Sequence, residues 1–495
     1  MGSRVRVLSI THVRPAGAQT SNPPPQGAAG HAIKLSLFDT MFIALTPIQR
    51  LFFYEGDDLP PFPDLARTLR SSLAATLAVF PPLAGAVVVS SSGDDADVVI
   101  DCSPATVSRG GGVRFVEAEY AGTAAEVRRL AGDAEHDAEA YAQLAPALEV
   151  GALPAPALAV QVTRPAAGGA AGVGAVVVGV SMSHVVADGQ ALWEFIRAWA
   201  AAARGGSAAG AGLVMTPPTF DRAAINRHPK AEEVARKFLR VFAPALPTLS
   251  ASSSRIYLKQ VNTLFPEPDS AVQGRRTYLL AVGQIQSLKH RISLHSKGAA
   301  DAADTSPATV MPPSTYAAVA SLVWTSAVRA KNSHNHADDD AYLMFAADCR
   351  ARLRPPLPSA FFGNCAKACY ARATVGELRA TGGGEALARA AAAVREAVRE
   401  QLADPLTDAE RWLERHRALP PDRVVQVGAS NRFAAYETDF GWGRPARVEL
   451  ASVFVREFVA VVGAPEGSVQ VSVVLDRDSM DGFEASFLSQ LHGAA

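Results

Sequence analysis

Apolar residues in the first part of this chain follow two patterns, short extended runs and one longer run with helical spacing. Residues 5–13, 49–56 and 113–120 are rich in β-branched and aromatic side chains, which favours strands. Residues 62–85 place apolar side chains three and four positions apart until a pair of prolines and a glycine end the pattern. The sequence therefore predicts strands interleaved with a long helix.

The pattern is clearest between residues 157 and 203. Apolar runs at 157–164 and 175–183 predict two buried strands, and residues 190–203 predict a helix. One face of this helix carries four large apolar side chains, namely Leu192, Phe195, Ile196 and Trp199. A short polar turn is expected between the second strand and the helix.

The second half mixes helices and strands in the same way. The end of a strand followed by a helix is predicted over 278–296. Further helices are predicted near residues 314–331, 384–402 and 478–491, and strands near 341–350, 446–455 and 468–476. Neither a strict strand–helix–strand alternation nor a repeat of fixed length is present. The predicted class is α/β, with mixed sheets flanked by helices.

The chain has 495 residues, which is too long for one hydrophobic core. A Gly-, Ala- and Ser-rich stretch at 203–212 is typical of a linker, and paired prolines follow it. We therefore predict an N-terminal domain over 1–204, a crossover over 205–270 and a C-terminal domain over 271–495.

The amino-acid composition and charge argue against some classes of function. Hydrophobic residues make up 48%, charged residues 19%, and the formal net charge is −1, so no basic field indicates nucleic-acid binding. Four cysteines in so long a chain favour free thiols in a reducing compartment. No signal-peptide core and no apolar run of roughly 18 residues is present, so we expect a cytoplasmic protein that does not enter a membrane.

The sequence lacks the motifs of several common classes of enzyme. The sequence has no phosphate-binding loop, no dinucleotide-binding glycine motif and no H-E-x-x-H zinc motif. The stretch "GVSMS" departs from the serine-hydrolase elbow because its last residue is Ser183 instead of glycine. The His- and Asp-rich run at 334–340 is typical of a solvated loop, so no metal and no redox cofactor is expected.

The turn after the strand at 175–183 holds the strongest candidate for chemistry. His184 stands at the strand end, where a rigid element would hold a general base at a cleft. A hydrogen-bonded histidine in a turn is the structural alternative. Asp188 would orient the imidazole if a helix began at His184, or would cap the helix and clamp the turn if the helix began later. Gly189 allows a tight turn. The local sequence leaves these roles open.

Two motifs carry a family resemblance. The stretch "HVVADG" resembles the H-x-x-x-D-G motif of the BAHD family of plant acyl-CoA-dependent acyltransferases, and "DFGWG" at 439–443 resembles its second signature. Residues 33–56, with Asp39, and residues 348–365, ending in "FFGNC", are also similar to family segments. The resemblance covers roughly residues 5 to 488.

The resemblance implies a two-domain fold like that of chloramphenicol acetyltransferase, with a channel between the domains. It implies that His184 is the general base, that no acyl-enzyme forms, and that Asp188 points away from the cleft and pairs with an arginine. Acyl-CoA is then a co-substrate, no further cofactor is needed, and the partners are acyl-CoA and a small-molecule acceptor. We expect a monomer.

The resemblance also assigns supporting residues. Structural support of the site is expected from Asp188, Gly189, Asp439, Gly441, Trp442 and Gly443. The CoA and substrate side is expected to include Ser314, Thr315, Asp348, Arg350 and Asn364. A helix cap explains Ser314 equally well, and a charge at a strand end explains Arg350.

The segment 427–445 indicates the substrate class. It is similar to the form found in malonyl and aromatic acyltransferases of anthocyanin, flavonoid and phenolic glucosides, although Asn431 replaces the usual proline. The stretch "LSLFDTMFI" likewise replaces the more aromatic "L-x-F-F-D-x-x-W". The expected activity is transfer of a malonyl or hydroxycinnamoyl group to a hydroxyl of such a glucoside. The alternatives are N-acylation of an aromatic amine or polyamine, and a non-catalytic partner protein of the same family.

Overall fold

A computed structural model describes most of the chain. The described residues are 3–17, 32–90, 97–109, 112–167, 174–205, 216–246, 256–258, 273–302, 312–331, 335–381, 384–452 and 457–493. They form two compact units. Unit 1 comprises Met1–Phe265, Leu353–Cys365 and Ala435–Phe454, and unit 2 comprises Pro266–Arg352, Ala366–Ala434 and Val455–Ala495. Two segments from the second half of the sequence thus belong to unit 1.

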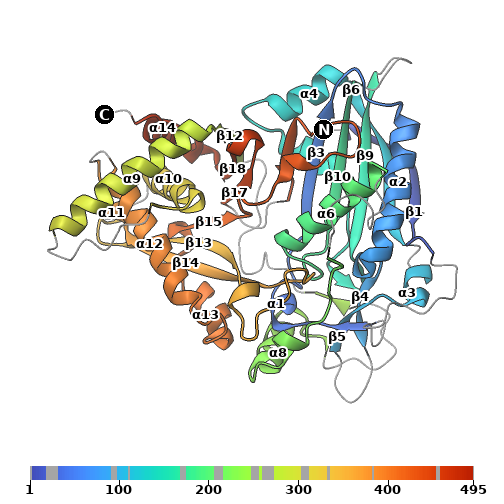
Figure 1. Ribbon diagram of the computed structural model, residues 1–495, viewed down its shortest axis with the longest axis horizontal. Coiled ribbons are helices and arrows are strands. Elements are labelled where there is room, and N and C mark those ends of the chain that lie inside the picture. The colour runs from blue at the N-terminus through green and yellow to red at the C-terminus, as the bar shows by residue number, and fades with distance from the viewer. Residues whose placement is uncertain are drawn as a thin grey trace. The chain divides into compact units, whose positions relative to one another are not determined.

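The main sheet of unit 1 has six strands (Figure 1). Their order is β1 (Val5–Val13), β6 (Val113–Thr123), β9 (Leu158–Ala167), β10 (Ala175–Met182), β3 (Ile48–Glu55) and β16 (Arg447–Leu450). The β6–β9 pair is parallel and the other pairs are antiparallel, so the sheet is mixed as expected. The edge strand β16 comes from the segment that follows the "DFGWG" motif.

Helices cover both faces of this sheet. On one face α6 (Gly189–Ala203) packs beside α2 (Phe62–Val79) (Figure 1). Trp193 of α6 meets Phe52 of β3 edge to face at 5.9 Å. On the other face lie α4 (Ala124–Gly132) and α5 (Ala138–Leu144), where Tyr141 contacts Phe53 at 5.7 Å. Consecutive residues of β3 thus face opposite layers, as the period of two in a strand requires.

Shorter elements complete unit 1. A four-stranded sheet has the order β2 (Ala32–Lys34), β5 (Asp97–Asp101), β4 (Ala86–Ser90) and β8 (Ala155–Pro156), and β11 (Ile256–Tyr257) pairs with β7 (Ala152–Leu153). The short helices are α1 (Leu37–Thr40), α3 (Pro104–Arg109), α7 (Ala223–Asn226) and α8 (Ala231–Phe242). The expected crossover over 205–270 lies partly outside the described residues; its described part includes α7, α8 and β11.

Unit 2 is built on a second six-stranded mixed sheet. Its order is β12 (Gln273–Leu280), β18 (Val469–Asp476), β17 (Phe458–Gly463), β15 (Val424–Gly428), β13 (Asp340–Asp348) and β14 (Ala366–Thr374). Its helices are α9 (Val282–Ala302), α10 (Thr315–Ala330), α11 (Val375–Arg379), α12 (Glu385–Gln401), α13 (Trp412–Arg417) and α14 (Arg477–His492). The nearly fully buried α10 packs against α12 and α14.

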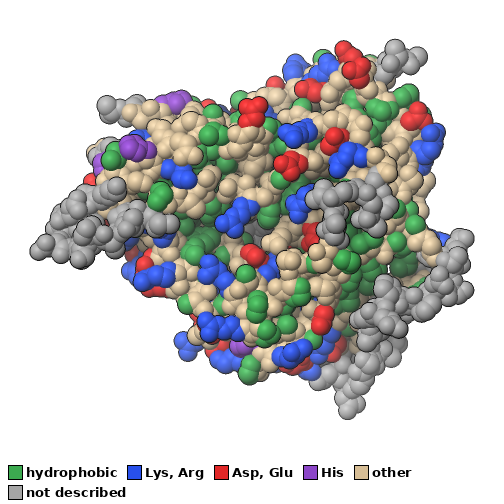
Figure 2. All heavy atoms as spheres, in the orientation of Figure 1, with side chains coloured by type: hydrophobic (Ala, Val, Ile, Leu, Met, Phe, Trp, Pro, Cys, Tyr) green, Lys and Arg blue, Asp and Glu red, His purple; other side chains and the backbone are tan. Residues whose placement is uncertain are grey.

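These elements confirm the predicted α/β class with mixed sheets. Cys369 lies in the strand β14, and all four cysteines are free thiols. Basic and acidic side chains alternate over the face shown in Figure 2, with apolar side chains between them. Across the described part of the chain, no helix combines the length and the apolarity that spanning a bilayer requires.

Gly179, in the middle of β10, permits a close approach on which the strand depends. A Cβ at this position would lie 2.4 Å from the carbonyl oxygen of Leu144, at the end of α5. We expect Gly179→Ala to lower the free energy of unfolding by about 1 to 3 kcal/mol, because the backbone of a packed layer must move. Urea denaturation of the variant and the wild type measures the difference.

The matched control is Gly132→Ala at the end of α4, where an added Cβ meets nothing within 4 Å. It should leave stability unchanged or raise it, because alanine is the better helix former. Equal stability of Gly179→Ala and the wild type would contradict the close-packing argument.

Candidate active site

The candidate site is the turn that joins β10 to α6. Ser183 continues the strand pairing by donating its N–H to the carbonyl of Ala157 at 2.8 Å. The chain then turns, with the N–H of Val186 bonded to the carbonyl of Ser183 at 3.1 Å, and α6 begins at Gly189. His184 is partly buried at the end of a strand whose residues are all buried. A rigid element therefore carries the imidazole.

Asp188 caps the helix that follows the turn. One of its oxygens, Oδ1, accepts the N–H of Ala191 at 3.1 Å, and Oδ2 accepts the N–H of Cys365 at 3.0 Å. The helix begins after Asp188. His184 therefore lies outside the helix, and the two side chains do not share a helical face. These contacts support the role of a clamp that joins the turn to residues 353–365. An arginine partner for Asp188 stays a prediction.

Asn364 and Arg222 hold the carbonyl groups of the turn. The amide nitrogen of Asn364 donates to the carbonyls of His184 at 2.9 Å and Val185 at 3.0 Å. Nη2 of Arg222 is 3.4 Å from the carbonyl oxygen of Val186. Three successive carbonyl groups thus have side-chain donors. Because both donors are buried, they fix the backbone of the turn without help from water.

Asp39 anchors both of these donors. Its Oδ1 accepts the amide of Asn364 at 2.9 Å, and its Oδ2 accepts Nε of Arg222 at 3.3 Å. The same carboxylate accepts the N–H and the hydroxyl of Ser36, at 2.8 and 2.7 Å, in the capping box of α1. Asp39 is 0% exposed, so this ion pair lies in a region of low dielectric constant where losing one partner is costly. We name Asp39, Arg222 and Asn364 the brace.

Burial affects the protonation state of His184. Desolvation lowers the pKa of His184 below its ordinary value of 6.5. Its own backbone carbonyl, the charge of Asp188 and the side chain of Asn364 act in the opposite direction, because each favours the imidazolium. The balance leaves a neutral imidazole near pH 7, which is the form that accepts a proton.

The "DFGWG" stretch forms a separate loop within unit 1. Oδ1 of Asp439 accepts the N–H of Gly441 at 2.7 Å and of Gly443 at 3.0 Å, folding the loop over its own carboxylate. Gly441 and Gly443 have φ values of 108° and 96°, in the region where side chains are strained. The glycines of the motif are therefore required by the backbone.

This loop fastens to β3 and to the C-terminal end of α6. The hydroxyl of Tyr54 on β3 donates to the carbonyl of Thr438 at 2.7 Å, and the Tyr54 ring meets Trp442 at 5.9 Å. Phe440 packs on Trp199 of α6 at 4.8 Å, and Arg204 at the end of α6 donates to the carbonyl of Asp439. The loop thus holds one end of α6 while Asp188 holds the other.

The remaining predicted residues have structural contacts of their own. In unit 2, Ser314 caps α10 by accepting the N–H of Ala317 at 3.1 Å, and Thr315 is the first residue of that helix. Arg350 pairs with Asp348 at 2.7 Å beside the end of β13. Asn364, expected on the CoA side, belongs to unit 1 and bonds the turn of His184. Contact of these residues with CoA stays a prediction.

Arg222 and Phe42 were not predicted from the sequence as site residues. Arg222 lies in the expected crossover, where a lone arginine gives no sign of its partners. Phe42 follows the aspartate of the "FDTMF" stretch by three positions, and its ring stacks on His184.

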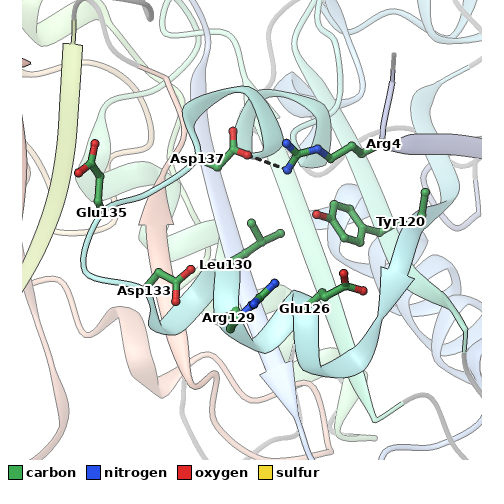
Figure 3. A pocket seen from close by; sticks show the side chains of 9 residues that line it. Arg4, Tyr120, Glu126, Arg129, Leu130, Asp133, Glu135 and Asp137 are labelled. Atoms are coloured by element: carbon green, nitrogen blue, oxygen red, sulfur yellow. Dashed lines mark hydrogen bonds and ion pairs between the residues drawn. The ribbon is translucent and has the colours of Figure 1, made fainter. Parts of the chain in front are cut away.

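Unit 1 also has a surface hollow of about 400 Å³ that none of the predicted site residues lines (Figure 3). Arg4, before β1, bonds Asp137 there at 2.7 Å, and Arg129 and Glu126 come from α4. Acidic side chains outnumber the two arginines along its wall. The hollow is open and of mixed charge, in contrast to the buried setting of the turn.

Comparison with known proteins assigns this chain to a class, the acyl-CoA-dependent acyltransferases. The profile of the transferase family matches residues 19–489. The chain belongs to this family, the BAHD acyltransferases, as the two motifs predicted.

Relatives and solved structures match over almost the whole length. Phenolic glucoside malonyltransferase 1 of Arabidopsis thaliana is 27% identical over 97% of this chain and 96% of its own. The malonyl-CoA:anthocyanidin 5-O-glucoside-6''-O-malonyltransferase of the same plant is 28% identical, with 98% of each chain covered. The crystal structure of vinorine synthase has a TM-score of 0.64 at 20% identity and covers 98% of each chain.

Substitution of Asp188 distinguishes a clamp role from an orienting role, because a clamp contributes to stability as well as to activity. Asp188→Asn keeps one acceptor oxygen but presents an NH₂ group to another donor, and it removes the charge. We expect the free energy of unfolding to fall by about 1 to 3 kcal/mol together with activity, as measured by thermal melting and acyl transfer.

The control for this prediction is Thr123→Ala, which removes the side-chain cap of α4 elsewhere in unit 1. It should lower stability by about 1 kcal/mol without changing kcat. An Asp188→Asn variant that loses activity but keeps the wild-type melting temperature would instead assign Asp188 the orienting role.

Proposed function

We propose that this protein transfers a malonyl or hydroxycinnamoyl group from its CoA thioester to a hydroxyl of a phenolic or flavonoid glucoside. The observation that carries the proposal is the position of His184 at the end of β10, on a turn whose carbonyl groups are held by buried donors, and burial also lowers the pKa of its imidazole. The names of the full-length relatives support the substrate class, since both describe malonyl transfer to a glucoside.

In the proposed reaction His184 acts as the general base. A sugar hydroxyl is too weak an acid to ionise near pH 7, so its proton passes to the imidazole while its oxygen attacks the thioester carbonyl. The tetrahedral intermediate then collapses with loss of the CoA thiolate, and the imidazolium returns the proton to that sulfur. The products are the ester and free CoA, and the protein forms no covalent bond.

The turn suits this chemistry because it holds the base still. Proton transfer and attack need the hydroxyl and the imidazole within hydrogen-bond reach in one geometry. The carbonyl of His184 is bonded to Asn364, and the carbonyl of Val186 lies against Arg222. Rotation of the backbone at the base would break those contacts within a buried cluster, so the turn is pre-organised for the reaction.

The residues before the second signature favour a glucoside acceptor. Residues 427–445 are similar to the form found in glucoside acyltransferases, and the "T-S-W" of shikimate and quinate transferases is absent. Asn431, in place of the usual proline, restores a backbone N–H at this point. The family pattern therefore narrows the acceptor to a class of compounds and leaves its particular ring and sugar to experiment.

Release of free thiol tests the proposal directly. The purified protein is mixed with malonyl-CoA or coumaroyl-CoA and a panel of phenolic glucosides, with aromatic amines and polyamines as the competing acceptors. Thiol release should depend on a glucoside, and His184→Ala should lower kcat by about 10²- to 10⁴-fold with CoA binding retained.

Each other outcome has a meaning for the proposal. Turnover with amines alone would replace it by N-acylation. Binding of acyl-CoA without release by any acceptor would favour a non-catalytic partner protein. Wild-type activity of His184→Ala would remove the base role.

The pH dependence follows from the buried base. Because its pKa is lowered, His184 stays neutral to a lower pH than an exposed histidine, and kcat/KM should fall only at a pH below 6.5. Asp188→Asn removes a charge that raises this pKa, so its acidic limb should move to still lower pH. Initial rates between pH 4.5 and 8.5, corrected for thioester hydrolysis, measure the acidic limb of the wild type and that of the variant. An acidic limb above pH 6.5 would contradict the assignment.

A further inference from the structure

The imidazole of His184 lies against an aromatic ring. The ring centroids of Phe42 and His184 are 3.9 Å apart, and the two planes differ by 8°. The rings therefore overlap face to face. Phe42 is partly buried and lies just after α1. The motifs of the family resemblance assign it no role.

The brace fixes this stacked geometry from both sides. Phe42 donates its N–H to the carbonyl of Asp39 at 3.1 Å, which ties its backbone to α1. The carboxylate of Asp39 holds Asn364, and Asn364 holds the carbonyl of His184. One buried residue, Asp39, is thus connected to the backbone of Phe42 through its own backbone carbonyl and to the backbone of His184 through its carboxylate and Asn364.

Stacking of this kind favours one charge state of the imidazole. Two neutral aromatic rings prefer an offset or edge-to-face arrangement to a parallel sandwich. A cation over a ring face is attracted by the negative face of the ring. The arrangement of Phe42 and His184 therefore suits an imidazolium better than a neutral imidazole.

We propose that Phe42 is a positioning residue for the base: its ring holds the plane of the His184 imidazole and stabilises the imidazolium that forms as the acceptor loses its proton. This inference rests on the proposed function, in which His184 is the base. The stabilisation is present only while the proton is on the imidazole, so it lowers the barrier instead of strengthening substrate binding.

Other groups of unit 1 also act on the imidazole and stay constant when Phe42 is changed. The charge of Asp188 and the side chain of Asn364 favour the imidazolium. Asp39 and Arg222 form an ion pair with 3.3 Å between Nε and Oδ2, so their opposite charges offset each other's effect on the imidazole. A change in the pKa of His184 or in kcat that follows substitution of Phe42 alone is therefore attributed to the loss of its ring.

Two substitutions and one control distinguish the effect of the aromatic ring from the effect of side-chain volume. Phe42→Leu keeps an apolar side chain without a ring, whereas Phe42→Trp restores a ring with a stronger attraction for cations. The control is Phe62→Leu, which removes an aromatic ring that lies under Arg164, at 5.3 Å, elsewhere in unit 1. Thermal melting of each variant shows whether the fold is kept.

The kinetic experiment measures kcat, KM and the pH profile. Phe42→Leu should lower kcat about 3- to 30-fold and move the acidic limb to lower pH by about one pH unit. The KM for acyl-CoA should change by less than about twofold. Phe42→Trp should restore kcat and the limb, and Phe62→Leu should match the wild type. Loss of kcat in Phe42→Leu without movement of the limb would overturn the inference.

A titration without substrate tests the same inference independently. In protein labelled with ¹⁵N-histidine, the His184 signals are those lost in His184→Ala. Their titration midpoint should fall in Phe42→Leu and be restored in Phe42→Trp. Equal midpoints in the wild type and Phe42→Leu would overturn the role of Phe42.

The outcomes distinguish this inference from the proposed function. If His184→Ala abolishes turnover while Phe42→Leu behaves as the wild type in both experiments, the base role stands and the positioning role fails. If His184→Ala keeps turnover, the proposed function fails whatever the titration shows. A melting temperature of Phe42→Leu far below the wild type moves the decision to Phe42→Trp, whose midpoint must equal or exceed that of the wild type.

Discussion

The active-site turn depends on one buried carboxylate. Asp39 has no exposed surface and accepts hydrogen bonds from Ser36, Arg222 and Asn364. A charge in such a place is tolerable only when donors surround it, so Asp39 requires the other two members of the brace, Arg222 and Asn364. The same two side chains reach the carbonyls of the turn that carries His184. The hydrogen bonds that the buried charge of Asp39 requires thus also fix the backbone of the turn at His184.

The two motifs of the chain have complementary mechanical roles. Asp188, in the first motif, caps the start of α6, and the loop of the second motif binds its end through Arg204 and Phe440. Tyr54 joins the same loop to β3, beside the strand that leads to the base. The helix after the turn is thus held at both ends, which resists displacement of His184 along the strand direction.

Much of this arrangement could be predicted from the sequence. The unbroken apolar run of β10 and the helical spacing of α6 depend on local patterns, so strand, turn and helix followed directly. The motifs identified the family and pointed to His184. The brace could not be derived, because Arg222 acts through hydrogen bonds to carbonyls that every residue possesses. Asn364 was expected to face CoA, since its motif neighbours gave no indication that its amide bonds the turn.

The brace also has a consequence for the order of folding. Its members are far apart along the chain, with 325 positions between Asp39 and Asn364. A ribosome releases His184 well before Asn364, so the nascent N-terminal half contains His184 but lacks the donor for its carbonyl. Contacts of such long sequence separation form late, because a large loop must close first. Truncated or stalled chains therefore carry the histidine motif without the hydrogen bonds that fix its turn.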